Sequence, residues 1–337
     1  MNHQLVKEIL CEIGEAVRNK VLTSLKEQSI EVLSAVHEEA AADTIYQIDK
    51  DVEDIIVPLL KQHTESLGGI VLLAEGIEEN AVDGFKLPDV SGNTAVKIIM
   101  DPIDGTRGIM YDKRSAFFLA GAAPNRGKSN SLNDIEVAVM VELPTTRSAY
   151  SDILWAIKGV KAERNCRHLE SNEMKVLPLR PSQSETLYGG FGQVSRFFPP
   201  GREILAAIEE DMLNEVFPDM PEGKTIVFED QYISSGGQMY ELLVGHDRFI
   251  ADIRTLLNKR LVSEGRKKGH ICHPYDICAK LIAEEVGIII TDAYGKLLDA
   301  PMNLYHEIDW IGYANKNIKK QLELPLFKAM KKHKLIN

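Results

Sequence analysis

The chain has 337 residues, of which 44% are hydrophobic and 26% are charged, as in ordinary folded globular proteins. This composition excludes a disordered or fibrous protein. The formal net charge of -11 argues against binding to a nucleic-acid polymer, because a phosphate backbone requires a concentrated basic surface.

Cysteine spacing and hydropathy indicate the compartment. The four cysteines have no C-x-x-C spacing, so neither a zinc ribbon nor a disulfide framework is expected. The sequence has no N-terminal signal and no apolar run of about 18 residues, the length that a membrane span needs. We therefore expect a cytoplasmic protein with reduced thiols and no membrane partner.

The first elements predicted along the chain are two helices. Apolar residues recur at helical spacing over residues 3–28, and this stripe is expected to face the core or, if it exceeds what one core covers, the surface of a homodimer. The polar residues 37–46 predict a loop. A second helix opens at Asp49, and acidic residues such as Asp51 and Glu53 in its first turn are explained by the helix dipole alone.

Two predicted strands then end in acidic residues. Residues 69–79, GIVLLAEGIEE, predict a strand that delivers Glu75 to one end of a sheet. Residues 95–106, AVKIIMDPIDGT, predict a strand that is buried on both faces. Because such a strand does not keep carboxylates in its middle, Asp101 and Asp104 are expected at its open end. The three carboxylates would meet there.

The DPIDGT segment has the chemistry of a metal and phosphate site. Pro102 stiffens the chain, and Gly105 permits a sharp turn or a close approach to a ligand. Carboxylate oxygens suit Mg²⁺, and the backbone amide and hydroxyl of Thr106 suit phosphate oxygens. An ordinary surface turn is the alternative, since Asp, Pro and Gly are common turn residues.

The remainder of the chain predicts an antiparallel sheet followed by an α/β unit. Strands are expected over residues 116–123, 135–143 and 150–160. The proline-containing segment 176–184 is the expected boundary between an N-terminal subdomain, 1–180, and a C-terminal subdomain, 181–337. Beyond it strands and helices alternate, as in layered α/β proteins.

Four segments together resemble a known superfamily. DPIDGT, residues 101–106, resembles the signature of the inositol monophosphatase and fructose-1,6-bisphosphatase superfamily. IDKDVE, residues 48–53, is similar to its T/A-D-x-x-V/A-E segment. Residues 234–254 resemble its glycine-containing helix and the strand that follows, and residues 273–295 resemble its second signature, W-D-x-A-A…E-x-G-G…T-D-x-x-G. The resemblance implies the superfamily's five-layer α/β/α/β/α sandwich.

The resemblance also implies an activity and its metal ligands. It implies a magnesium-dependent phosphomonoesterase that hydrolyses a small phosphorylated polyol or sugar, such as inositol monophosphate, by direct attack of a metal-activated water. Two or three Mg²⁺ ions per site are implied. The implied metal ligands are Glu75, Asp101, the Ile103 carbonyl, Asp104 and Asp276.

The other roles follow from the same resemblance. Thr106, assisted by Asp49 or Glu75, is implied to orient the water, while the amides of Gly105 and Thr106 hold phosphate oxygens. The implied contacts to the substrate's alcohol part are Gly236, Gly237 and Asp252. A tight helix N-terminus and a salt bridge between Asp252 and Arg254 explain those three residues as well. A helix cap is likewise compatible with Asp276.

Departures from the superfamily pattern leave the substrate open. Gly76 stands where a second glutamate is usual, and Glu78 or Glu79 would have to substitute. Arg107 and the Pro274-Tyr275 pair are similar to residues of histidinol-phosphate phosphatases. The T-R-G sequence is similar to that of 3'(2'),5'-bisphosphate nucleotidases, and fructose-1,6-bisphosphatase is a further alternative.

Two alternatives lie outside this group of enzymes. A haloacid-dehalogenase-type phosphatase requires Asp-x-Asp, whereas this chain has Asp-x-x-Asp. A non-catalytic metal-binding regulatory protein would keep the fold and lose a ligand, but none of the expected ligands is missing.

Overall fold

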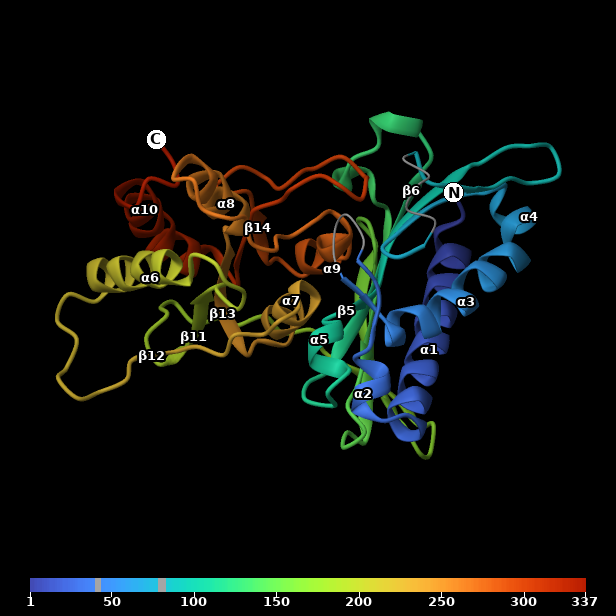
Figure 1. The fold of residues 1–337 in the computed structure, drawn as a ribbon, viewed down its shortest axis with the longest axis horizontal. Coiled ribbons are helices and arrows are strands. Elements are labelled where there is room, and N and C mark those ends of the chain that lie inside the picture. The colour runs from blue at the N-terminus through green and yellow to red at the C-terminus, as the bar shows by residue number, and fades with distance from the viewer. Residues whose placement is uncertain (40–43, 78–82) are drawn as a thin grey trace.

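The computed structural model describes residues 1–39, 44–77 and 83–337, and these form alternating layers of helices and sheets (Figure 1). Helices cover the outer face of a large sheet, further helices lie between this sheet and a smaller one, and a third set of helices covers the smaller sheet's outer face. This arrangement confirms the layered α/β/α/β/α sandwich expected from the sequence.

The large sheet has eight strands in the order β10-β9-β8-β7-β6-β5-β3-β4. Its strands are β3 (Ile70–Ala74), β4 (Phe85–Leu87), β5 (Val96–Asp104), β6 (Ala116–Pro124), β7 (Val137–Leu143), β8 (Tyr150–Ile157), β9 (Lys161–His168) and β10 (Met174–Leu177). Only β3 and β5 of these strands run parallel as neighbours; the other pairs are antiparallel.

Two long helices, α1 (His3–Glu27) and α3 (Gln47–Gln62), pack on the outer face of this sheet. The short elements of this half are α2 (Ile30–Leu33), β1 (Val36–Glu39), β2 (Thr44–Tyr46), α4 (Thr64–Leu67), α5 (Thr106–Ile109), and the single 3-10 turns η1 (Gly127–Ser129) and η2 (Leu132–Asp134). β1 and β2 pair antiparallel, so the expectation of a loop over residues 37–46 is wrong for the described part of that segment.

The smaller sheet has five strands in the order β12-β11-β13-β15-β14. Its strands are β11 (Gly190–Val194), β12 (Val227–Phe228), β13 (Asp247–Asp252), β14 (Ile289–Thr291) and β15 (Trp310–Tyr313). The helical elements of this half are α6 (Arg202–Val216), α7 (Ser235–Val244), α8 (Arg254–Ser263), η3 (Tyr275–Ile277), α9 (Lys280–Glu285) and α10 (Lys316–Lys332).

Three hydrophobic cores separate the layers. The first lies between α1, α3 and the large sheet, the second between the two sheets around α7 and α9, and the third between the smaller sheet and α6, α8 and α10. Strand β13 illustrates the division, since Ile250 belongs to the middle core and its neighbours Phe249 and Ala251 belong to the outer one. This alternation is the period of two that a strand imposes on its side chains.

The apolar stripe of α1 is buried within the chain itself. Residues from Val6 to Val21 on this face have almost no exposed surface and pack against the large sheet and α3. Of the two interpretations from sequence, the stripe is therefore core, and it gives no reason to expect a dimer. Among the described residues, no helix is both long and apolar enough to cross a membrane.

A homodimer remains a prediction that rests on the superfamily resemblance alone. We expect light scattering at micromolar concentration to give twice the 37.6 kDa mass of the chain. A monomer mass under the same conditions would reject the dimer without affecting the site described below.

Candidate active site

The end of strand β5 carries two of the acidic residues expected at the site. Asp101 pairs with Leu119 of β6 and Asp104 pairs with Phe117, so one extra residue lies in β5 between the two pairs. This β-bulge bends the strand and re-aims the side chains that follow it. The strand thus continues through both aspartates rather than ending before them, and the bulge is what brings their carboxylates to one side.

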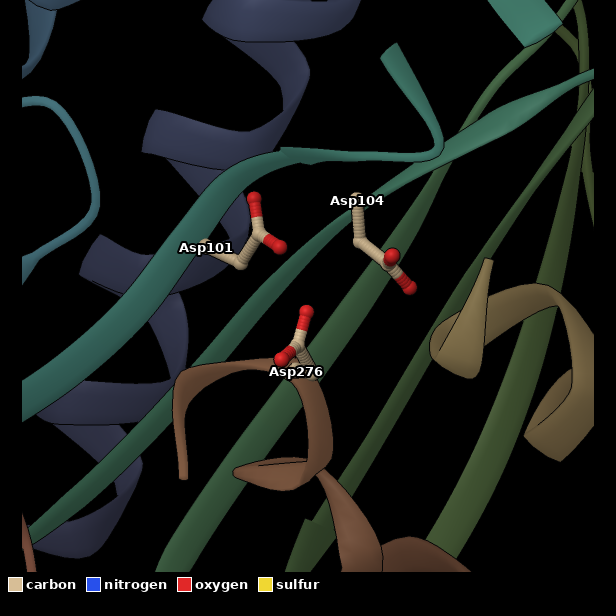
Figure 2. Close-up of side chains that lie close together, drawn as sticks. All are labelled: Asp101, Asp104 and Asp276. Carbon is tan, nitrogen blue, oxygen red and sulfur yellow. The ribbon is translucent and has the colours of Figure 1, made fainter. Parts of the chain in front are cut away.

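A third carboxylate reaches the same place from the C-terminal half. Figure 2 shows Asp101 and Asp104 on β5 and Asp276 on the turn η3, with the three side chains pointing toward one another. One carboxylate oxygen of each lies within 4.8 Å of those of the other two. Residues far apart in the chain therefore form one acidic cluster, which we call the triad.

The environment of the triad disfavours negative charge. Burial, followed by the charges of Glu75, Asp104 and Asp276, raises the pKa of Asp101 well above its ordinary value. Burial also raises the pKa of Asp104 to about 6, against hydrogen bonds from Gly236 and Ser234 that lower it. Buried carboxylates this close together repel one another unless a cation lies between them.

The position of Asp104 is fixed by the start of helix α7. Its Oδ2 accepts hydrogen bonds from the Ser234 hydroxyl, at 2.9 Å, and from the Gly236 N–H. The Gly237 N–H in turn donates to the Ser234 Oγ at 2.7 Å, which caps the helix. Both glycine amides are thus engaged inside the protein, and this geometry gives no support to their expected contact with substrate.

Position 236 requires glycine because of this contact. A Cβ atom there would lie 2.8 Å from Asp104 Oδ2 and 2.9 Å from Leu119 Cδ2, closer than carbon atoms approach either. We predict that Gly236→Ala displaces Asp104 and weakens Mg²⁺ binding by about ten- to a hundredfold, the usual effect of disturbing a group that orients a metal ligand. Calorimetric titration with Mg²⁺ checks this, and an unchanged affinity would contradict the role given to α7.

Asp49 and Thr106 meet across the chain as expected from the sequence. The Thr106 Oγ1 lies 2.9 Å from Asp49 Oδ1 and 2.8 Å from the Ile103 carbonyl oxygen. Asp49 is itself held by the Tyr46 N–H, which donates to its Oδ2 at 2.8 Å in a capping box at the start of α3. When the hydroxyl donates its single proton to Asp49, the Thr106 oxygen can accept a hydrogen bond from a water.

The turn after β5 depends on Gly105. Its φ of +102° lies in the left-handed region that favours glycine, and it precedes the short helix α5. A Cβ atom here would also come within 3.0 Å of Ser234 Cβ. Gly105, Thr106 and Ile103 all line the same pocket as the triad.

Glu75 lies near the triad without joining it. It lines the pocket and follows β3, and its N–H donates to the Met100 carbonyl at 3.3 Å, but its carboxylate is outside the 4.8 Å cluster. Gly76, where a second glutamate is usual, has a φ of +74°, in the region that favours glycine. Glu78 and Glu79, the expected substitutes, lie outside the described residues.

Asp276 does not cap helix α9 as the sequence suggested. It lies inside the turn η3, four residues before α9 begins at Lys280, and its Oδ2 accepts a hydrogen bond from the His273 N–H at 2.5 Å. The ring of Tyr275, which replaces the usual tryptophan, is fully buried and stacks on His273 with a centroid distance of 5.2 Å. The turn is therefore held by local contacts that leave the carboxylate beside the pocket.

The other wall of the pocket is aromatic and cationic. The Arg254 guanidinium lies 4.5 Å from the centroid of the Phe197 ring, and the Arg107 guanidinium lies 5.2 Å from that of Phe198. His270 packs edge-on against Phe198. All five residues line the pocket.

Asp252 lies behind this wall rather than in it. Both oxygens of its fully buried carboxylate accept hydrogen bonds from Arg254, at 2.8 and 2.6 Å. Asp252 thus holds Arg254 in place, and the geometry gives no support to its expected contact with a substrate hydroxyl. Sequence reasoning missed Phe197 and Phe198 because adjacent aromatic residues in a proline-containing loop carry no motif.

The chemistry of the donors fits a hard divalent cation. Within the described part of the chain, the Ile103 N–H donates to Oδ1 of Asp101, and Ser234 and Gly236 donate to Oδ2 of Asp104. A carboxylate has about four lone-pair sites, so each keeps acceptor capacity for a metal. Carboxylate and carbonyl oxygens are the ligands that Mg²⁺ prefers. A cation would also relieve the repulsion within the triad.

Comparison with solved structures identifies the fold. The chain is similar to a fructose-1,6-bisphosphatase of Leishmania major, with a TM-score of 0.64 and 13% identity over 96% of this chain and 94% of that one. It is also similar to the extragenic suppressor protein suhB of Bartonella henselae, with a TM-score of 0.62, 15% identity and coverage of 96% and 99%. An inositol monophosphatase of Anabaena gives a TM-score of 0.60, 16% identity and 97% coverage of both chains.

These likenesses show that the chain has the fold of inositol monophosphatases and fructose-1,6-bisphosphatases. No protein-family model matches the sequence. No curated protein matches it either.

Proposed function

We propose that the chain is a magnesium-dependent phosphomonoesterase of the inositol monophosphatase and fructose-1,6-bisphosphatase superfamily, acting on a small phosphate ester. The observation that carries the proposal is the buried triad of Asp101, Asp104 and Asp276, with the Thr106 hydroxyl placed beside it by Asp49. A surface turn would not bury three carboxylates against one another. The fold of known phosphatases adds support.

The residues divide into those that hold metal and those that handle the substrate. Asp101 would contribute to two cation sites, one shared with Glu75 and the Ile103 carbonyl and the other shared with Asp104 and Asp276. Bound there, Mg²⁺ would lower the pKa of a water and neutralise the charge that develops on the leaving alkoxide.

Thr106 and Asp49 orient the attacking water in this proposal. Asp49 accepts the Thr106 proton, so the hydroxyl oxygen presents a lone pair to a water hydrogen and turns the water's own lone pair toward phosphorus. The amides of Gly105 and Thr106, which follow the sharp turn, would hold phosphate oxygens. No phosphorylated enzyme is required, because water attacks directly.

The alcohol part of the substrate would lie against Arg107, Arg254, Phe197 and Phe198. A polyol or sugar, as in inositol monophosphate, places hydroxyl groups near the two guanidinium groups. A second candidate is a 3'(2'),5'-bisphosphate nucleotide, which the aromatic residues favour, since a base can stack on a phenyl ring and a second phosphate can pair with arginine.

Phosphate release from a panel of esters tests the proposal. We expect hydrolysis of at least one among inositol, sugar, histidinol and 3'-nucleotide phosphates in Mg²⁺, loss of that activity in chelator, and inhibition by Ca²⁺, whose larger radius relaxes octahedral coordination. Full turnover in chelator would contradict it. Mg²⁺ binding without hydrolysis of any ester would favour a regulatory metal-binding protein instead.

A further inference from the structure

A second pocket lies on the same face of the large sheet as the triad, toward the opposite end of the strands. Val71 of β3 pairs with Lys86 of β4 on one side and with Lys97 of β5 on the other, so these three residues form one row across the sheet. Lys97 precedes Asp101 by four residues on the same strand, which separates the row from the triad by roughly 13 Å. The two sites are therefore distinct.

The cation of Lys97 is buried in this pocket. Only 4% of the residue is exposed, and its Nζ donates to the Gly127 carbonyl at 2.9 Å. Burial lowers the pKa of Lys97, and the nearby Asp83 opposes this only in part. An ammonium group has three protons to donate, so an acceptor in the pocket would satisfy a further one.

Positive groups outnumber negative ones among the described residues of the lining. The described lining contains one carboxylate, Asp83, and three lysines, Lys86, Lys97 and Lys128. Asp83 is largely exposed and already pairs with Lys128 at 3.2 Å. The surroundings of Lys86 and Lys97 thus favour an anion.

The opposite wall comes from the connection between β14 and β15, which reaches back to the large sheet (Figure 1). It is anchored there by a bridge between Pro301 and Ser131 and by the Met302 N–H, which donates to Asn130 at 2.9 Å. Met302 and Tyr305 give this wall an apolar surface. The volume of this open pocket, about 630 Å³, is that of a small-molecule site.

We propose that this pocket binds a small organic phosphate, with the phosphate group between Lys86 and Lys97 and the organic part against Met302 and Tyr305. The inference is independent of the proposed hydrolytic activity. It requires only that the anion bind between the row of Lys86, Val71 and Lys97 on the sheet and the loop that connects β14 to β15.

Ligand-observed NMR with phenyl phosphate tests this on the metal-stripped full chain. Removing the cation takes away the metal that would hold a phosphate at the triad, and the lysine variants below assign the remaining binding to the second pocket. We expect one saturable site for phenyl phosphate, and competition by inorganic phosphate. Lys97→Met and Lys86→Ala should each weaken binding by about tenfold or more, the effect of removing one charge-assisted hydrogen bond. The control Lys175→Ala, an exposed lysine on β10, should bind as the wild type does.

Two results would overturn the proposal. One is the absence of saturable binding to the wild-type chain, which would make Lys97 a structural residue that only ties β5 to Gly127. The other is unchanged phosphate binding by the Lys86→Ala variant. Because Lys86 is exposed, its substitution is expected to leave the fold intact, so this test stands even if Lys97→Met does not fold.

Discussion

Asp101→Asn is expected to reduce phosphate release by on the order of a thousandfold or more, because Asp101 is the carboxylate assigned to both cation sites. The amide keeps the shape of the side chain and an acceptor oxygen but removes the negative charge. Asp276→Asn should also reduce activity, yet mainly by loss of the second cation. Steady-state phosphate release over a range of Mg²⁺ concentrations distinguishes the two variants.

The same substitution should leave the metal-free protein as stable as the wild type or more stable. Because the folded-state pKa of Asp101 is raised, the folded protein binds this proton more tightly than the unfolded chain does. The contribution of this proton to the stability of the folded state is complete below the pKa that Asp101 has in the unfolded chain. It is lost as the pH rises through the pKa that Asp101 has in the folded protein. Asp104 behaves likewise between its ordinary 3.8 and about 6. At neutral pH the wild type therefore carries an electrostatic cost that the Asp101→Asn variant would not.

Thermal melts with and without Mg²⁺ check this expectation. The Tm of metal-free Asp101→Asn should equal or exceed that of the wild type at neutral pH, and the rise in Tm on adding Mg²⁺ should shrink because the variant binds the ion less well. Near-normal turnover with an unchanged Mg²⁺-induced rise would make Asp101 a turn residue, and the assignment of the site would then be wrong.

Thr106→Val is expected to lower kcat by about a hundredfold or more, within the range for losing a group that assists proton transfer and orientation. Valine has nearly the shape of threonine, so the turn after Gly105 should persist and Mg²⁺ affinity should change little. Kinetics with the best ester of the panel, together with a Mg²⁺ titration, separate these effects.

A control is available in a second threonine whose hydroxyl makes an internal hydrogen bond. Thr64→Val removes a hydroxyl that donates to the Leu60 carbonyl at 3.3 Å near the end of α3, away from the lining of the site. Its activity should equal that of the wild type. A Thr106→Val enzyme as active as this control would contradict the role of the hydroxyl in orienting water.

Local patterns were sufficient to predict the elements that the site is built on. The apolar spacing of residues 3–28 predicted helix α1, and the β-branched run before Asp101 predicted strand β5. The superfamily resemblance predicted that Asp49 would lie beside Thr106 and that Asp104 would lie beside Asp276. The spacing of charges alone would have left these pairs ambiguous.

The supporting contacts could not be predicted because they depend on long-range packing. The bulge between Asp101 and Asp104 is a register shift against β6, and no local signal marks it. The engagement of Gly236 with Asp104 requires α7 and β5 to meet, although the residues are 132 positions apart. The sequence also left core and dimer surface open for α1, since a helix's apolar stripe does not reveal what will cover it.

Anomalous scattering from crystals of the wild-type protein grown with Mn²⁺ is the most direct test of the metal site. The account predicts anomalous density between the carboxylates of Asp101, Asp104 and Asp276, and its loss or reduction in Asp101→Asn. The absence of any peak at the triad in the wild-type protein, at Mn²⁺ concentrations that saturate its binding in solution, would contradict the claim that these aspartates hold the catalytic metal.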